Sequence, residues 1–262
     1  MRTLSFVIAC GLMWGGLARA ADDGFGSISG TVRLTGPVPT IPMIYTKQDV
    51  DVCGSRARPA QSLVLGTTQA VRDAVVYLGP IASAGRRLIG DASAILDQRG
   101  CEFVPRVQTA ESGAMLVLRN SDPTLHVVRI DSLNGTNGPT TLLHVATPYA
   151  GYEKKFQLPN FKEPTLLKAT DSNGHGWMTA YLAIMPGWPA MLTDVNGRFT
   201  LAGIPSGAYK LYAWHEVLGT LARDVKVSGG RVTSVDLEFG SNRNATAAST
   251  APKSSYGPAA DW

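Results

Sequence analysis

Short apolar segments separated by turn residues limit what this chain can form. Most run for four to eight residues, are rich in Val, Thr, Tyr and Leu, and are bounded by Gly, Pro, Asn or Asp, as in a sandwich or barrel. The 262-residue chain holds 28 Gly, 16 Pro and only 17% charged residues, which suits one sizeable domain or two small ones. The predicted fold class is therefore all-β.

Regular structure is expected in a few ranges. The expected strands are 27–34, 71–78, 115–118, 181–185, 198–201, 209–214, 222–227 and 232–239. One short helix is expected over residues 85–97. Residues 241–262 are Ala, Ser, Asn, Pro and Gly without periodicity, which predicts a disordered tail.

The first twenty residues have the pattern of a secretory signal peptide. Arg2 precedes an apolar run over residues 4–14, and Ala18-Arg19-Ala20 matches an A-x-A cleavage site. We expect cleavage after Ala20 and a periplasmic or secreted protein. The alternative is a lipoprotein signal ending at Cys10, and the run is too short to span a membrane. Cleavage would lower the formal charge of +4 by the two arginines removed.

Charge and cysteine content narrow the function further. The weak positive charge, with no Lys/Arg stripe interleaved with aromatics, excludes a nucleic-acid groove. Cleavage would leave Cys53 and Cys101, and an even pair in an oxidising compartment predicts a disulfide worth about 4 kcal/mol at most. A thiolate metal ligand is the alternative, but neither cysteine has a His or Met at ligand spacing.

Two separated parts of the chain share one pattern. Residues 27–33 and 74–78 come first, and residues 193–201 and 204–212 follow about a hundred residues later. Asp194 to Gly197 predicts a turn, Phe199 an inward side chain, and residues 205–207 a chain reversal. Together these segments resemble a carboxypeptidase regulatory-like, transthyretin-like sandwich, which would comprise residues 22–80 plus 187–240.

The intervening residues 97–186 carry a second resemblance. Residues 120–126 end in His126, and residues 171–180 contain His175 and Met178 at H-x-x-M spacing. This arrangement resembles the metal loops of cupredoxins, the plastocyanin and azurin type. The resemblance implies a cupredoxin-like β-sandwich, inserted in or fused to the regulatory-like one, as in exported bacterial proteins that combine these two modules. It also implies copper ligands at His126, His175 and Met178.

The copper-ligand cysteine of that family is replaced by Asp171. A carboxylate is a harder ligand than a thiolate, so any Cu(II) site here should be pale rather than blue, and zinc could bind opportunistically. The alternatives are hydrogen-bonded histidines without metal, a core role for Met178, and an Asp171 that opens the turn 171–174.

Enzyme signatures do not occur in the sequence. It lacks G-x-S-x-G, H-E-x-x-H, a Walker loop and a Rossmann fingerprint. His144 carries no motif. His215 and Glu216 are adjacent on an expected strand, so they would point to opposite faces and cannot share a proton, and His215 is expected to pack beneath Trp214 against the inserted module.

The function expected from the sequence is that of an exported, non-catalytic copper-binding or redox-partner protein that works with a periplasmic or envelope protein. The alternative is a metal-free module that binds a protein or a glycan through exposed Trp188, Tyr212 and Trp214. Nucleic acid is not an expected partner, and no transmembrane segment is expected in the mature chain. If His126, His175 and Met178 converge around a cavity that Asp171 faces, the metal-binding function is favoured over the metal-free module.

Overall fold

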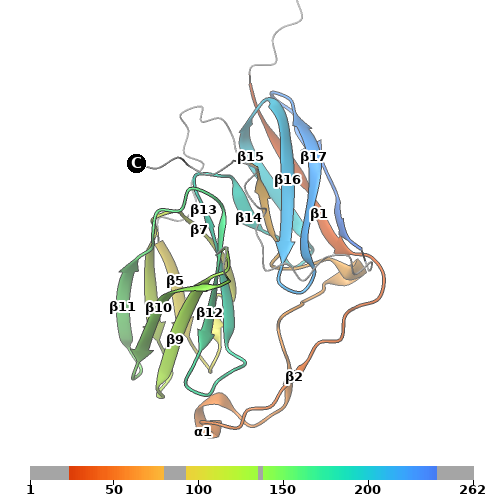
Figure 1. The fold of residues 1–262 in the computed structure, drawn as a ribbon. Helices are drawn as coiled ribbons and strands as arrows, with labels where there is room; N and C mark the ends of the chain where they lie inside the picture. Colours follow the sequence, from red (N-terminus) through yellow and green to blue (C-terminus); the bar gives the residue numbers. More distant parts are fainter. Residues whose placement is uncertain (1–23, 80–92, 135–137, 241–262) are drawn as a thin grey trace, which may run out of the picture.

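A computed structural model describes residues 24–79, 93–134 and 138–240 of the chain. Within these ranges the regular secondary structure is almost entirely strand, which confirms the all-β prediction (Figure 1). The signal peptide and the tail predicted at the two ends lie outside the described residues. No helix in the described ranges is long and apolar enough to cross a membrane.

The first sandwich is made from both ends of the described chain. Its first sheet has the order β15-β1-β18, with β19 also pairing with β1, and its second has the order β14-β4-β16-β17. The bounds are β1 (Phe25–Leu34), β4 (Val75–Leu78), β14 (Ala190–Leu192), β15 (Arg198–Pro205), β16 (Gly207–His215), β17 (Gly219–Val227), β18 (Val232–Ser234) and β19 (Leu237–Phe239). Buried Ile28, Val76, Phe199 and Leu211 belong to one apolar core within it.

Strand β4 links the two halves of this sandwich. It pairs antiparallel with β16, with Leu78 opposite Leu211, and with β14, with Val75 opposite Leu192. Between β4 and β14 the chain builds the second sandwich, so a single sheet joins segments more than a hundred residues apart. Turn chemistry closes the later half, since Gly197 has φ 69° and Asp194 Oδ1 accepts hydrogen bonds from two backbone N–H groups.

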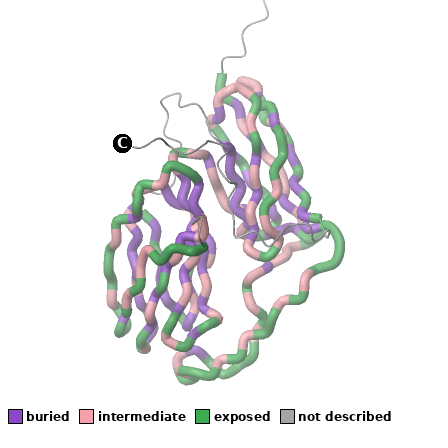
Figure 2. The backbone as a smooth tube through the Cα atoms, viewed as in Figure 1, coloured by how far each residue is buried: buried purple, intermediate pink, exposed green. Residues whose placement is uncertain are grey.

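The second sandwich has the two-sheet form expected of a cupredoxin-like domain. One sheet has the order β10-β9-β12-β13-β7 and the other β11-β8-β5-β6. The bounds are β5 (Ser93–Gln98), β6 (Phe103–Val104), β7 (Val107–Glu111), β8 (Met115–Asn120), β9 (His126–Ser132), β10 (Thr140–Thr147), β11 (Tyr152–Gln157), β12 (Thr165–Asp171) and β13 (Thr179–Met185). Buried positions recur along these strands (Figure 2), and many of their side chains form one apolar core.

The helix predicted over residues 85–97 is wrong where the structure describes it. Residues 93–98 form β5, which runs parallel to β8. Ala94 and Leu96 are buried while Ile95 is 42% exposed, an alternation that suits a strand with one face on the core. Residues 85–92 lie outside the described ranges.

An aromatic cluster joins the outer faces of the two sandwiches. Tyr77 stacks on Tyr212 with ring centroids 5.0 Å apart, and Tyr181 meets Trp214 edge-on at 5.2 Å. The prediction that Trp188, Tyr212 and Trp214 are exposed is therefore wrong, because each is partly buried in this cluster. Burial here removes apolar ring surface from water and fixes the contact between the sandwiches.

A long segment with little regular structure runs from the first sandwich along the second. It contains β2 (Met43–Ile44), β3 (Arg58–Pro59), the four-residue helix α1 (Val50–Cys53) and the 3₁₀ turn η1 (Thr67–Gln69). The predicted disulfide is confirmed, since Cys53 at the end of α1 is bonded to Cys101 of the second sandwich. Cys53 thus packs with the second sandwich, not with the first as its place in the range 22–80 implied.

Candidate metal centre

Strand pairing brings the two histidines of the resemblance together. His126 is the first residue of β9 and Asp171 is the last residue of β12, and these antiparallel strands place Asp171 opposite Val128. His175 follows in the loop between β12 and β13. The imidazole centroids of His126 and His175 are 4.8 Å apart, and neither side chain is exposed to solvent.

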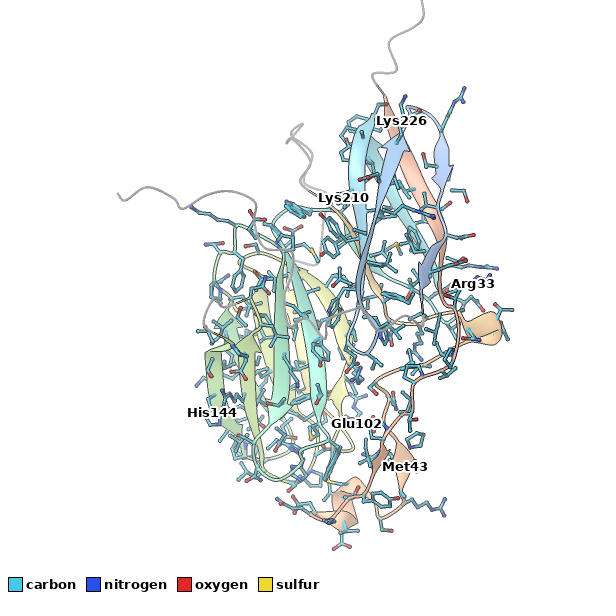
Figure 3. The ribbon with its side chains drawn as sticks, turned by 45° about the vertical axis from the view of Figure 1, so that its right-hand side comes forward. Arg33, Met43, Glu102, His144, Lys210 and Lys226 are labelled. Atoms are coloured by element: carbon cyan, nitrogen blue, oxygen red, sulfur yellow. A yellow bond between two sulfur atoms is a disulfide. The ribbon has the colours of Figure 1, made fainter. Side chains whose placement is uncertain are left out.

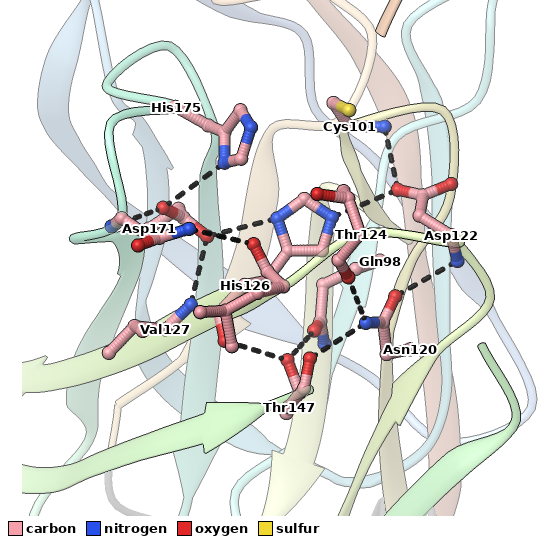
Figure 4. A network of polar contacts seen from close by, with 12 residues as sticks. Gln98, Cys101, Asn120, Asp122, Thr124, His126, Val127, Thr147, Asp171 and His175 are labelled. Carbon is pink, nitrogen blue, oxygen red and sulfur yellow. Dashed lines mark hydrogen bonds and ion pairs between the residues drawn. The ribbon is translucent and has the colours of Figure 1, made fainter. Parts of the chain in front are cut away.

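His126 has a carboxylate at each ring nitrogen. Its Nδ1 lies 3.0 Å from Asp171 Oδ2, and its Nε2 lies 3.1 Å from Asp122 Oδ2 on the other side of the ring (Figure 4). The Asp122 carboxylate also accepts hydrogen bonds from the backbone N–H groups of Gly100 and Cys101. Asp122 is therefore held in position independently of His126.

His175 repeats this arrangement. Its Nε2 lies 3.0 Å from Asp49 Oδ2, and its Nδ1 lies 3.4 Å from Asp171 Oδ1. Among the described residues this Nδ1 is buried and makes no hydrogen bond. Asp49 also accepts a hydrogen bond of 2.9 Å from the Thr124 hydroxyl. The two rings and the carboxylates of Asp49, Asp122 and Asp171 thus alternate as one chain of contacts.

Asp171 occupies the centre of this chain of contacts, with one oxygen toward each Nδ1. It also opens the turn at residues 171–174, because its Oδ1 accepts a hydrogen bond of 2.6 Å from the backbone N–H of Asn173. The turn interpretation of Asp171 is therefore confirmed, and its role as a metal ligand stays a prediction. In that turn Gly174 has φ 96°, and a Cβ there would lie 1.9 Å from Gln48 Oε1. Glycine thus lets the segment that carries Asp49 approach the loop.

Electrostatics favour the charged forms of His126, Asp171 and Asp49. Burial lowers the pKa of His126, but the hydrogen bonds and negative charges of Asp171 and Asp122 outweigh burial, so the pKa is raised above its ordinary value. Burial raises the pKa of Asp171, yet hydrogen bonds from His126 and from two backbone N–H groups bring it below its ordinary value. The Thr124 hydroxyl is the main cause that lowers the pKa of Asp49.

The disulfide and Trp177 lie against the same rings. A nitrogen of His175 and the sulfurs of Cys53 and Cys101 all lie within 4.8 Å of one another. The Trp177 indole N–H donates a hydrogen bond of 2.9 Å to the Cys101 carbonyl, and its ring meets His175 edge-on at 5.3 Å. Trp177 therefore borders the site, while Asp171 lies between the two imidazoles.

Met178, also predicted for the site, and the two histidines that were not predicted for it lie in different places. Met178 is 1% exposed in the core of the second sandwich, and its backbone N–H bonds the His175 carbonyl; its role as a ligand stays a prediction. His144 is exposed on β10, where its Nε2 lies 2.9 Å from the Ser172 hydroxyl (Figure 3). His215 is buried near the interface of the two sandwiches, where burial, followed by the charge of Arg106, lowers its pKa to about 4.

His126, Asp171 and His175 offer three ligand atoms within 4.8 Å of one another. Sequence reasoning missed Asp49, Asp122 and Thr124. Asp122 carried a signal, since it stands four residues before His126 in the segment 120–126. Asp49 carried none, because the segment around it has no periodicity that could place it.

Solved structures that this chain resembles at low similarity include the following three proteins. The Cu-containing nitrite reductase (NirK) from Thermus scotoductus SA-01 is 16% identical, with 41% of this chain and 25% of that chain covered and a TM-score of 0.28. A purple cupredoxin from Nitrosopumilus maritimus is 17% identical, with 36% of this chain and 100% of that chain covered and a TM-score of 0.28. Auracyanin from Roseiflexus castenholzii is 12% identical, with 37% of this chain and 100% of that chain covered and a TM-score of 0.29.

This chain thus spans a quarter of the nitrite reductase. No protein-family model matches the sequence, and no curated protein sequence matches it. These similarities are too low to assign an activity. Function is therefore inferred from the geometry of the site itself.

Proposed function

We propose that this protein binds one divalent transition-metal ion, Cu(II) in first place, through His126, His175 and Asp171. The observation that carries this proposal is the orientation of the two rings, whose Nδ1 atoms both face the Asp171 carboxylate. Imidazole and carboxylate suit Cu(II) and Zn(II), and Cu(II) comes first in the general order of affinity. A ligand set of two nitrogens and one oxygen without a thiolate would give a pale site.

Counting donors supports the proposal. The metal-binding form of an imidazole is neutral and has one N–H, so in that form the two rings supply two donors for four ring-nitrogen contacts with carboxylates. His126, whose raised pKa favours the charged ring, must release a proton to reach this form. If both Nε2–H groups donate to Asp122 and Asp49, both Nδ1 lone pairs face Asp171 oxygens. A bound cation would turn these acceptor-to-acceptor contacts into shared coordination. The buried His175 Nδ1, which has no hydrogen bond in the described ranges, is the clearest sign of this mismatch.

The outer contacts are those that metal-binding histidines usually make. A ligating imidazole commonly donates its second N–H to a carboxylate, which fixes the ring and raises its basicity. Asp122 and Asp49 lie at the right nitrogens for this role, and both have further hydrogen bonds that hold them. The metal would supply Lewis acidity and, for copper, one-electron chemistry, while the chain's own residues orient the rings and exclude water from them.

The wider proposal rests on the patterns in the amino-acid sequence. The protein would be exported, non-catalytic, and a redox or metal-transfer partner of another periplasmic or envelope protein. Its first sandwich would be of the carboxypeptidase regulatory-like type and would serve as the frame that carries the second. A role through exposed aromatics is less well supported, since the aromatic side chains named for it are partly buried between the sandwiches.

Metal titration of the oxidised mature protein tests the proposal. One equivalent of Cu(II) should bind, seen by calorimetry and metal analysis, with a tetragonal electron paramagnetic resonance spectrum and no intense thiolate band. His126→Ala and His175→Ala should each abolish this binding. His144→Ala is the matched control, because His144 is exposed and bonds Ser172. Binding that survives both site variants would place the copper at other residues and reject this site, and no binding at all would favour the metal-free interaction module.

A further inference from the structure

The disulfide sulfurs lie beside the imidazoles of the candidate metal centre. The Cys101 sulfur is within 4.8 Å of a nitrogen of His175, together with Cys53, and within 4.8 Å of a nitrogen of His126, together with an oxygen of Asp122. All five side chains belong to buried residues. The sulfur of Cys101 is therefore near both rings, on the side where Asp122 lies and away from Asp171 (Figure 4).

Cys101 is held in place by contacts that do not depend on the disulfide. Its backbone N–H donates to Asp122 Oδ2 at 2.8 Å, and its carbonyl accepts the hydrogen bond from Trp177. The neighbouring Gly100 N–H donates to the other Asp122 oxygen at 2.6 Å. These bonds would keep Cys101 beside the histidines if its sulfur were released.

The segment of Cys53 also has contacts of its own with the second sandwich. Gln48 Nε2 donates to the Asn173 carbonyl at 2.7 Å, and Asp49 binds both His175 and the Thr124 hydroxyl. These contacts come from residues four and five positions before Cys53. Reduction would therefore free the two sulfurs while polar contacts still hold α1 near the site.

We propose that reduction of the Cys53–Cys101 disulfide creates a second, sulfur-containing ligand set at this centre. The Cys101 thiolate would join His126 and His175 there, with Cys53 adjacent. The ligand of this set is a soft metal ion, Zn(II) or Cu(I), because thiolate and imidazole together favour such ions. This inference rests on the proposed function for the two histidines, and it adds a redox condition to metal choice.

The reducing step is thiol–disulfide exchange with an external dithiol. A thiolate of the dithiol attacks the Cys53 sulfur, forms a mixed disulfide, and releases Cys101 as a thiolate. Cys53 is the less deeply buried of the two cysteines, at 7% exposure against 0% for Cys101, and is therefore the first target. The second thiol of the dithiol then attacks its own sulfur in the mixed disulfide and releases Cys53. The dithiol leaves as a disulfide, and the protein gains two electrons and two protons. Metal binding at the sulfurs then displaces these protons.

Anaerobic cobalt titration tests the proposal on the full mature chain. Co(II) added to protein reduced with a phosphine should give a thiolate-to-cobalt charge-transfer band in the near ultraviolet, and Co(II) added to oxidised protein should not. Cys53→Ser, which leaves Cys101 free without a reductant, should give the band. Cys101→Ser, which leaves Cys53 free, is the matched control and should lose most of it. His126→Ala in the Cys53→Ser background should also lose it.

A second measurement does not depend on colour. Zn(II) should protect Cys101 of the reduced protein from iodoacetamide, with near-complete loss of labelling in the time that fully labels metal-free protein. Equal cobalt bands in Cys101→Ser and Cys53→Ser, or labelling of Cys101 that ignores Zn(II), would overturn the proposal. So would loss of near-ultraviolet circular dichroism in the reduced chain, since the rings would then no longer be in place.

The proposed function can fail or hold separately from this inference. Its measurement uses Cu(II) on the oxidised protein, in which both cysteines are in the disulfide. Copper binding there without a cobalt thiolate band after reduction would retain the proposed function and reject the redox-dependent ligand set. A cobalt thiolate band in the reduced protein without Cu(II) binding to the oxidised protein would reject the His126, His175 and Asp171 site and keep the thiolate-containing ligand set.

Discussion

The Asp49 carboxylate lies 3.0 Å from His175 Nε2, although the two residues are 126 positions apart in the chain. Asp49 directly precedes α1, and Cys53 at the end of α1 is bonded to Cys101. One covalent link therefore fastens a segment with little regular structure to the candidate metal centre. The disulfide should accordingly support both the stability of the second sandwich and the orientation of His175.

Removing this link should destabilise the protein. The Cys53→Ala, Cys101→Ala double variant frees a loop whose ends are 48 residues apart. The chain-entropy model gives a loss of about 4 kcal/mol at most for a loop of that size, and about 2 kcal/mol or more is typical. Urea denaturation of the oxidised wild type and of the variant measures this difference. An unchanged midpoint would mean that the polar contacts of Gln48 and Asp49 hold the segment by themselves.

The carboxylates behind the rings should control metal affinity. Asp122→Asn and Asp49→Asn each keep the shape of the side chain but remove the charge that receives the Nε2–H group. Each should weaken Cu(II) binding by roughly 10- to 100-fold, the range typical of such outer contacts. Asp224→Asn is the control, because Asp224 is 84% exposed in the first sandwich and pairs with Lys210. Competition titration with a copper chelator gives the affinities. Equal effects of all three changes would contradict the role of Asp122 and Asp49 as the carboxylates that support the metal-binding rings.

His215 should make stability depend on pH. Its folded pKa, lowered by burial and by Arg106 to about 4, lies below the ordinary 6.5, so the unfolded chain binds more protons between these values. Stability from neutral His215 is complete above about pH 6.5 and falls as the pH drops toward 4. The full loss is on the order of 3 kcal/mol. His215→Asn keeps an acceptor for the Val217 N–H and should flatten this slope in denaturation at several pH values. An unaltered slope would exclude His215 as its cause.

Local sequence signals account for much of the fold. Turn chemistry at Asp194 and Gly197, and alternation along strands such as β1, depend on a few neighbouring residues and are therefore visible in one sequence. The disulfide was also predictable, because the expected removal of Cys10 with the signal peptide would leave a single possible pair. His126 and His175 were found through their spacing relative to strand ends, and the pairing of β9 with β12 brings them together.

Tertiary contacts explain what the sequence could not reveal. Residues 93–97 look helical in isolation, but pairing of β5 with β8 buries Ala94 and Leu96 on one face. Tyr212 and Trp214 look like exposed aromatics, yet the outer faces of the two sandwiches pack on each other and cover them in part. Asp49 reaches the site through a disulfide and a long irregular segment, for which no local pattern exists.

The last prediction concerns the thiolate that position 171 lacks. The Asp171 side chain is fully buried between the Nδ1 atoms of His126 and His175, so Asp171→Cys would bring a sulfur between two imidazoles. Loaded with Cu(II), this variant should turn blue, because the intense visible band of blue copper needs a bond between copper and a cysteine sulfur. Wild-type protein with Cu(II) should lack that band, and His126→Ala in the variant should abolish it.

Ser172→Cys is the matched control for position, since residue 172 is exposed and bonds His144 on the outer face. It should bind copper without the band. Mass analysis after alkylation must first show that Cys53 and Cys101 remain paired in each variant. A folded Asp171→Cys protein that stays colourless with bound or added Cu(II) would show that the two rings cannot share a metal with residue 171. The hydrogen-bonded histidine network would then be a metal-free structural element, held together by its three carboxylates.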